Sequence, residues 1–132
     1  MKPKPLGMTL VELMVVLSVL AITAAIVYPL YTTQVQKARR YDAQGVLFTL
    51  GNQLEQRRAT QPNVGYTGFV LSDFSELSAQ LNNHYSFSVN LSTLSYDLIA
   101  TPVPGSSQAG DRCGTLSLNE VGEKAPVGNC WK

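Results

Sequence analysis

The sequence predicts an α+β fold in which a long N-terminal helix, partly transmembrane, packs on a small antiparallel sheet. Three observations predict it. An apolar run without charge extends from Leu13 to Tyr28, and apolar residues at helical spacing follow it. Further along, three segments alternate apolar and polar residues, as strands do when one face is dry and the other is wet. The apolar stripe of the helix is the available cover for the dry face.

The apolar run is long enough to cross a bilayer. Only Ser18 and Thr23 interrupt it, and residues 10–30 would form a helix about 30 Å long, the thickness of the hydrocarbon core. A helix on the surface of a soluble protein normally carries a polar stripe, which this one lacks. We therefore expect a membrane-spanning segment with a single carboxylate, Glu12, near its start.

The helix is expected to run on as a rod to about Arg58. Its second part, residues 31–60, is amphipathic because apolar residues recur in steps of three or four. Leu47 widens this stripe and Asp42 interrupts it. The stripe consists of Tyr31, Val35, Ala38, Val46, Leu50 and Leu54.

Proline and glycine mark the weak points and the end of this rod. Pro29 loses one backbone hydrogen bond and clashes with the preceding turn, so we predict a kink between Ala25 and Pro29. Gly45 and Gly51 weaken the helix, since glycine has a low helix propensity. A proline and two glycines within residues 60–68 then end it.

Residues 61–132 form the predicted head. Asp73–Gln80 is expected to be a short helix, because Asp73 and Glu76 have the spacing of a capping box. The alternating segments "YSFSVNL", "SYDLIATPV" and "GTLSLNEVG" are predicted to pair as a three-stranded antiparallel meander. Its dry face would carry Tyr85, Phe87, Val89, Leu91, Tyr96, Leu98, Ala100, Leu116 and Leu118.

The charge balance does not indicate a polyanionic partner, since ten Lys and Arg stand against nine Asp and Glu. The pairs Arg39–Arg40 and Arg57–Arg58 lie about five helical turns apart and would project from one face of a straight helix. This arrangement leaves DNA binding as an alternative. We interpret the pairs as a solvated face with Asp42 and Glu55 as local partners, and we expect no nucleic-acid partner.

Cys113 and Cys130 are the two cysteines of the chain. A membrane segment at the start can export the rest of the chain to an oxidising compartment, where this pair would form a disulfide. Closing that loop would stabilise the head by roughly 3 kcal/mol. The alternative is two free, buried thiols. No CxxC motif is present, which argues against redox catalysis.

No group of residues indicates catalysis, and we expect neither enzymatic activity nor a cofactor. His84 is the single histidine and stands at a strand start, so we interpret it as a turn or surface residue. Asp111, Asn119 and Glu120 offer oxygen atoms but lack the spacing of a calcium loop, so we expect no metal site.

Two ordinary interpretations of the N-terminal segment are a signal peptide, cut after "TAA" at residues 23–25, and an uncleaved signal anchor. Against the signal peptide, the apolar run continues beyond residue 25, and Glu12 stands at the front of the apolar region. Basic residues stand on both sides of the run, so they do not decide the orientation of an anchor.

A third interpretation comes from residues 7–31, "GMTLVELMVVLSVLAITAAIVYPLY", which follow the short basic leader "MKPKPL". This stretch resembles the start of type IV pilins and of the related pseudopilins of type II secretion. The matching features are the glycine, the glutamate, the apolar run and Pro29 at their spacing. The resemblance implies that a prepilin peptidase cuts between Gly7 and Met8 and that Met8, where the family usually has Phe, becomes N-methylated.

The resemblance also implies how the chain is organised. Residues 1–7 would be the leader, 8–30 the transmembrane and filament-core segment, 31–60 the amphipathic continuation, and 61–132 the β head. The chain would wait in the inner membrane, among lipid, with its head in the periplasm. The pilus assembly machinery would then add it to other pilin subunits in a filament at the cell surface.

Glu12 would have a partner in such a filament. A carboxylate at this depth is costly unless it is paired, and cleavage would create a positive amine at Met8. Residues 8 and 12 share a helix face, so one chain could pair with itself. Between staggered neighbours the same pair would set the register. The resemblance favours the second arrangement, in which Glu12 of one subunit recognises the Met8 amine of the next.

The segment "GTLSLNEVGEK" and the final "CW" resemble minor pilins, in which Cys113 and Cys130 frame the C-terminal loop. We therefore interpret the chain as a structural minor pilin of a type IV pilus, with twitching motility and adhesion as family-level implications. A pseudopilin of type II secretion is the runner-up, although pseudopilins often bind calcium or lack this cysteine pair. An alternative of another class is a signal-anchored periplasmic binding module that never polymerises.

Overall fold

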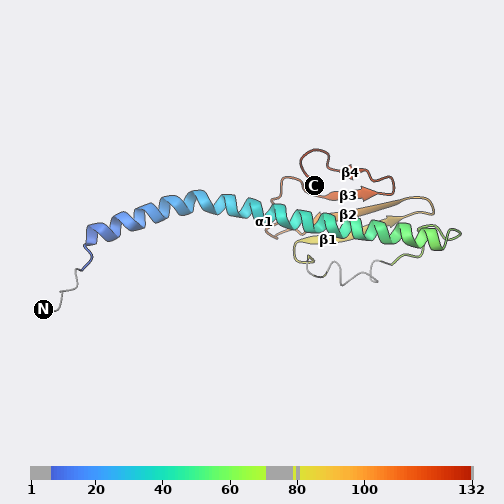
Figure 1. Ribbon diagram of the computed structural model, residues 1–132, viewed down its shortest axis with the longest axis horizontal. Helices are drawn as coiled ribbons and strands as arrows, with labels where there is room; N and C mark the ends of the chain where they lie inside the picture. Colours follow the sequence, from blue (N-terminus) through green and yellow to red (C-terminus); the bar gives the residue numbers. More distant parts are fainter. Residues whose placement is uncertain (1–6, 71–78, 80, 132) are drawn as a thin grey trace. The chain divides into compact units, whose positions relative to one another are not determined.

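The computed structural model describes residues 7–70, 79 and 81–131. It contains one long helix, α1, and four strands (Figure 1). The elements are α1 (Leu10–Thr60), β1 (Tyr85–Leu91), β2 (Tyr96–Pro102), β3 (Leu116–Asn119) and β4 (Lys124–Ala125). The predicted short helix Asp73–Gln80 lies outside the described residues, apart from Ala79.

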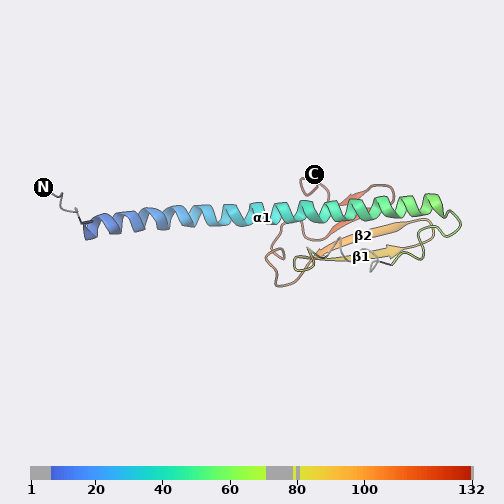
Figure 2. The same cartoon turned by 60° about the horizontal axis from the view of Figure 1, so that its bottom comes forward.

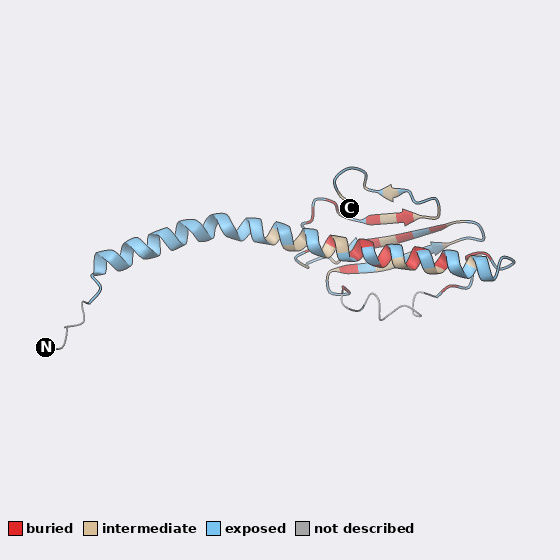
Figure 3. Ribbon diagram, in the orientation of Figure 1, coloured by how far each residue is buried: buried red, intermediate tan, exposed pale blue. Residues whose placement is uncertain are grey.

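The chain divides into two compact units, Met1–Gln34 and Val35–Lys132. In the first unit, every described residue from Gly7 to Tyr31 is exposed (Figure 3). Its large apolar side chains, such as Leu10 at 74 % and Ile22 at 65 %, have no protein cover. This part of α1 therefore has an apolar surface on all sides.

The second unit contains the sheet, whose strand order is β1-β2-β3-β4 with every neighbour antiparallel. Tyr85 faces Pro102 at one end of the β1–β2 pair, and Leu91 faces Tyr96 at the other. The predicted three-stranded meander is confirmed. The two-residue strand β4 extends it, and the sequence pattern did not predict this strand.

In the second unit, α1 runs along one face of the sheet, as Figures 1 and 2 both show. Gly51 allows the close approach: a Cβ there would lie 3.2 Å from Tyr96 Oη, 3.7 Å from Leu98 and 3.8 Å from Leu118. The core between helix and sheet also includes Ala43, Val46, Leu47, Leu50, Leu54, Tyr66, Phe69, Leu81, Tyr85, Ala100, Cys113 and Leu116. The predicted α+β packing is thus confirmed.

The predicted helical stripe is right at Val46, Leu47, Leu50 and Leu54; further towards the N-terminus Val35 is half-buried and the other predicted positions are wrong. Tyr31 and Ala38 are exposed, and so is Asp42, which was expected to interrupt the stripe. The buried positions of α1 are Arg40, Ala43, Gln44, Val46, Leu47, Leu50, Gly51 and Leu54. Two polar residues therefore lie on the buried face, and the pattern of apolar residues alone could not show this.

Candidate functional site

The polar side chains inside the apolar run are bonded to their own helix. Ser18 Oγ donates to the carbonyl of Met14 at 2.7 Å, and Thr23 Oγ1 donates to the carbonyls of Val19 and Leu20 at 3.0 and 2.9 Å. Satisfied hydroxyls of this kind are compatible with a lipid environment. Within the described part of the chain, α1 is the one helix long and apolar enough to cross a membrane.

Thr9 caps the N-terminus of α1. The backbone N–H of Glu12 donates to Thr9 Oγ1 at 3.2 Å, and Leu13 N–H donates to the Thr9 carbonyl at 3.2 Å. Thr9 and Glu12 therefore have the spacing of a capping box, and a carboxylate in the first turn interacts favourably with the helix dipole. The sequence "TLVE" contained this signal, which our sequence interpretation did not use. Glu12 thus has a local role besides any role between subunits.

α1 continues through Pro29. The hydroxyls of Thr32 and Thr33 donate to the Pro29 carbonyl at 3.0 and 3.2 Å. Such side-chain bonds to the preceding turn often accompany helix bending. The kink between Ala25 and Pro29 stays a prediction.

A buried ion pair joins α1 to the connection between β2 and β3. Arg40 is 3 % exposed, and its Nη1 lies 2.6 Å from Asp111 Oδ1. The same carboxylate oxygen accepts the Cys113 N–H at 3.0 Å, while Oδ2 accepts Gln108 Nε2 at 2.7 Å and Tyr85 Oη at 3.5 Å. Breaking such a pair from one side is strongly destabilising. The prediction of a solvated Arg40 is therefore wrong, because Asp111 compensates its charge inside the head.

Burial controls the titration of Tyr85 beside this ion pair. The loss of water around the phenol, and next the negative charge of Asp111, raise the pKa of Tyr85 to about 12. Gln108 Nε2 donates to Tyr85 Oη at 2.9 Å and to the carbonyl of Gln36 at 3.1 Å. Gln36 in turn donates to the carbonyl of Ser107 at 2.7 Å, and Arg39 donates to Ser107 Oγ. Residues 36–40 of α1 are therefore tied to the β2–β3 connection at several points.

The predicted disulfide between Cys113 and Cys130 is present, with an S–S distance of 2.02 Å. Two residues of α1 contact the C-terminal segment: Gln44 Nε2 donates to the Cys130 carbonyl at 2.6 Å, and the Phe48 ring meets the Trp131 ring edge to face at 5.8 Å. Lys124 Nζ lies 4.9 Å from the Phe48 ring and 5.6 Å from the Trp131 ring. The disulfide, the hydrogen bond and these rings together hold the C-terminal segment against the helix.

The second arginine pair lies near the C-terminal end of α1. Arg58 Nη1 donates to Tyr66 Oη at 2.8 Å, and Tyr66 donates to Glu55 at 2.7 Å. The hydrogen bond to Tyr66 raises the pKa of Arg58. Arg57 is exposed. Neither arginine pair is therefore fully exposed to water, because Arg40 is buried and Arg58 is bonded to Tyr66.

Behind Tyr66, burial raises the pKa of Tyr96 to about 12, and the charge of Glu55 adds to this shift. The Tyr66 and Tyr96 rings meet edge to face with centroids 4.9 Å apart. The aromatic contact fixes the loop after α1 against the start of β2.

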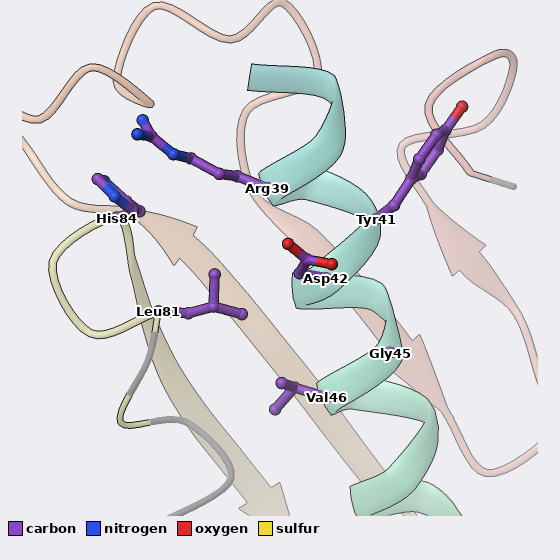
Figure 4. A pocket seen from close by; sticks show the side chains of 7 residues that line it. All are labelled: Arg39, Tyr41, Asp42, Gly45, Val46, Leu81 and His84. Carbon is purple, nitrogen blue, oxygen red and sulfur yellow. The ribbon is translucent and has the colours of Figure 1, made fainter. Parts of the chain in front are cut away.

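A surface hollow of about 510 Å³ lies between α1 and the turn before β1 (Figure 4). Arg39 and Asp42 reach into it from α1, Val46 and Leu81 form its apolar part, and His84 lies opposite Arg39. His84 belongs to the turn before β1, as predicted.

Among the described residues, no group of three His, Cys, Asp or Glu side chains comes together. Asp111, Asn119 and Glu120 are not brought together as ligands either: Asp111 is paired with Arg40, and Asn119 is bonded to Glu123.

The family model described as "Type IV minor pilin ComP, DNA uptake sequence receptor" matches residues 29–117, which is more than half of the chain. The chain belongs to the type IV minor pilins. A second model, the prokaryotic N-terminal methylation motif, matches residues 3–28 of this minor pilin. The two matches meet near Pro29, so the apolar segment and most of the head both have the family's pattern.

A solved structure of a type IV pilin from Shewanella oneidensis is similar to this minor pilin. The two chains are 28 % identical, with a TM-score of 0.55, and the match covers 74 % of this chain and 98 % of that one. A comparison with curated proteins gave no match. Family and fold are those of a structural subunit of the type IV pilus, as the sequence predicted.

Proposed function

We propose that this minor pilin is cut between Gly7 and Met8, waits in the inner membrane with its head in the periplasm, and enters the filament through the exposed part of α1. The observation that supports this most is that every residue from 7 to 31 is exposed. The side chains there are mainly apolar, and in water such a surface would aggregate. Lipid covers it before assembly, and the helices of other pilin subunits cover it afterwards. Prepilin peptidase and the assembly machinery are the further partners that this route requires.

Glu12 decides the register in this proposal. The free energy of the leucine and valine side chains changes little when neighbouring apolar helices replace lipid, because lipid tails are equally apolar. A charged side chain in the centre of a bilayer costs about 2.5–3.5 kcal/mol. The Met8 amine of an adjacent subunit would offset a cost of this kind only at one axial position. The pair therefore selects a single stagger between helices.

The first test is the mass of the mature N-terminus. We expect the chain isolated from membranes to begin at Met8 and to carry one methyl group on its amine. A Gly7→Asp variant serves as the matched control, because it should keep the whole leader and remain in the membrane. A wild-type chain that begins elsewhere, or that keeps its leader, would refute the proposed processing.

The second test separates the two roles of Glu12. Glu12→Gln removes the charge but keeps a side chain suitable for a capping box, whereas Thr9→Ala removes the capping oxygen and keeps the charge. At equal membrane levels, we expect Glu12→Gln to reduce the amount in sheared fibres by at least about tenfold, or ~1.4 kcal/mol. Thr9→Ala should stay near wild type. Normal incorporation of Glu12→Gln would rule out the charge pairing.

DNA binding by the head is a second candidate function, because the matching family model is described as a DNA uptake sequence receptor. We expected no nucleic-acid partner from the charge balance, and that expectation is untested. Lys37, Arg57 and Arg112 are exposed cations of the second unit and the candidates for phosphate contacts. The test is the affinity of the full chain, in detergent micelles, for duplexes with and without an uptake sequence over a range of salt concentrations.

Two results decide this candidate. A preference for the uptake sequence supports it, as does a salt dependence whose slope falls by about one when Arg57→Gln removes a phosphate contact. The Arg58→Gln variant is the neighbouring control, since Arg58 is engaged with Tyr66. Equal, weak binding of both duplexes would eliminate DNA recognition and leave the filament role untouched.

A further inference from the structure

The two sulfur atoms of the disulfide lie in different surroundings. Cys113 is 6 % exposed, and Arg40 Nη1 lies 2.8 Å from its Sγ. Cys130 is only partly buried, and Gln44 Nε2 donates to its backbone carbonyl. One sulfur is thus inside the head beside a guanidinium group, and the other is closer to water.

This difference controls thiol–disulfide exchange. In that reaction a thiolate attacks one sulfur of a disulfide and expels the other as a thiolate, so access selects the sulfur attacked and charge stabilisation selects the one expelled. A neighbouring arginine stabilises a thiolate. Access favours attack at Cys130, and the guanidinium of Arg40 favours departure of Cys113. Both effects therefore predict that an external thiolate attacks Cys130 and expels Cys113.

The charged and titratable groups that contact Cys113, or contact Asp111 beside it, come from three elements. Arg40 comes from α1, Asp111 from the β2–β3 connection and Tyr85 from β1. The Asp111 carboxylate accepts four donors, namely Arg40, Cys113 N–H, Gln108 and Tyr85, and its charge is thereby spread over them. Tyr85, with its pKa raised to about 12, is neutral near pH 7. The donor directed at the sulfur itself is the guanidinium group of Arg40.

We propose that Cys130 is the sulfur that exchanges with external thiols and disulfides, and that Cys113 is the resolving thiolate held by Arg40. During oxidation, the Cys130 thiolate attacks a disulfide R–S–S–R, forms Cys130–S–S–R and releases RS⁻. The Cys113 thiolate then attacks the Cys130 sulfur, forms the Cys113–Cys130 bond and releases the second RS⁻. The protein dithiol loses two electrons and the external disulfide gains them. The partner is an oxidant of the disulfide class, either a small molecule or an oxidoreductase in its disulfide form, and this inference does not depend on filament assembly.

The attack site is tested with single-cysteine variants of the full chain in detergent micelles. Cys113→Ser leaves Cys130, and Cys130→Ser leaves Cys113. Both reduced variants are mixed with glutathione disulfide, and mass spectrometry follows the mixed disulfide. We expect Cys130 to react at least about tenfold faster than Cys113, and we expect the ratio to fall towards one in urea, where the surroundings of both sulfurs are lost. Equal rates in the folded protein, or faster capture of Cys113, would overturn the assignment.

The role of Arg40 is tested by the rate of disulfide closure in the reduced chain as a function of pH. Arg40→Met combined with Asp111→Asn removes the guanidinium without stranding a buried carboxylate. We expect closure at pH 7 to slow by about tenfold and its pH midpoint to rise by about one unit. Arg58→Met is the matched control, because it removes an arginine bound to Tyr66, and it should close like wild type.

Arg40→Lys keeps the test decisive if the double variant does not fold. Arg40 Nη1 contacts both Asp111 Oδ1 and Cys113 Sγ, and the shorter lysine side chain with its compact ammonium group would not place a nitrogen at this point, so closure should slow here too. Folding of each variant is checked by near-ultraviolet circular dichroism. Closure at the wild-type rate and pH midpoint in a folded Arg40 variant would refute the role of the guanidinium, whichever cysteine is captured first.

Discussion

Gly45 and Gly51 are a matched pair of glycines for measuring how tightly α1 packs on the sheet. Alanine is favoured over glycine inside a helix by about 1 kcal/mol, and this gain applies equally to both positions. A Cβ at Gly45 would meet nothing within 4 Å, whereas a Cβ at Gly51 would lie 3.2 Å from Tyr96 Oη. The two substitutions thus differ mainly in what the added methyl group contacts.

Tyr96 cannot move aside freely. It is 5 % exposed, and the ring of Tyr66 lies against it at 4.9 Å with an interplanar angle of 86°. Overpacking a well-packed core costs about 1–3 kcal/mol. After the helix gain of about 1 kcal/mol is subtracted, Gly51→Ala should lower the free energy of unfolding by about 0–2 kcal/mol, and Gly45→Ala should raise it by up to about 1 kcal/mol.

Thermal unfolding of the full chain in detergent micelles, followed by near-ultraviolet circular dichroism of the head, measures this difference. A change of 1 kcal/mol corresponds to about 4–8 °C in a domain of this size, so Gly51→Ala should melt at least about 4 °C below Gly45→Ala. If Gly51→Ala melts at or above Gly45→Ala, the close approach of α1 to β2 and β3 does not limit the side chain at this position, and the reasoning fails.

Three further predictions concern the head. Raising the pH from about 10 to about 12 should lower the free energy of unfolding, because burial raises the pKa of Tyr85 and Tyr96 to about 12 while unfolded tyrosine titrates near 10. Urea titrations should show full stability below pH ~10. The Tyr85→Phe variant should lose less stability than wild type between about pH 10 and about pH 12. Arg40→Met should cost about 3–5 kcal/mol by stranding Asp111, and adding Asp111→Asn should recover most of this loss; equal urea-unfolding energies for the single and double variants would contradict the ion-pair account. Replacing both cysteines by serine should cost about 3 kcal/mol, and a loss below about 1 kcal/mol in the same assay would show that the loop closure contributes little.

The strands could be predicted because each repeats a period of two over several residues. Tyr96, Leu98 and Ala100 recur at every second position of β2, and all three are buried, while the residues between them are more exposed. β4 has two residues, Lys124 and Ala125, and a segment this short contains no period to detect. It pairs because the turn after β3 brings it alongside, which is a property of the chain path rather than of local composition.

The buried face of α1 was only half predictable. Its C-terminal part contains leucines at helical spacing, but its N-terminal part contains Arg40 and Gln44, residue types that are rarely buried unless they are paired. Their partners, Asp111 and Cys130, lie 71 and 86 residues further along the chain. No local pattern relates residues so far apart, so only the fold shows that these charges and dipoles are compensated.

Some residues of the candidate site could be predicted from the local sequence, and others could not. Gly7, Met8 and Glu12 follow from a motif that is local in sequence, and the N-terminal family match covers all three. The disulfide was predictable because two cysteines allow only one pairing. The neighbourhood of Arg40 and Cys113 was not, because it depends on how α1 meets the β2–β3 connection.

The Cys113–Cys130 bond also has a mechanical consequence. β3 and β4 both lie inside the covalent loop that it closes. A force that unravels the head can therefore not draw out these residues, and about 55–60 Å of contour length stays locked while the sulfurs remain joined. Under a stretching force, only the residues outside this loop could extend. After thiol reductants break the disulfide, the residues of the loop would extend in a separate step.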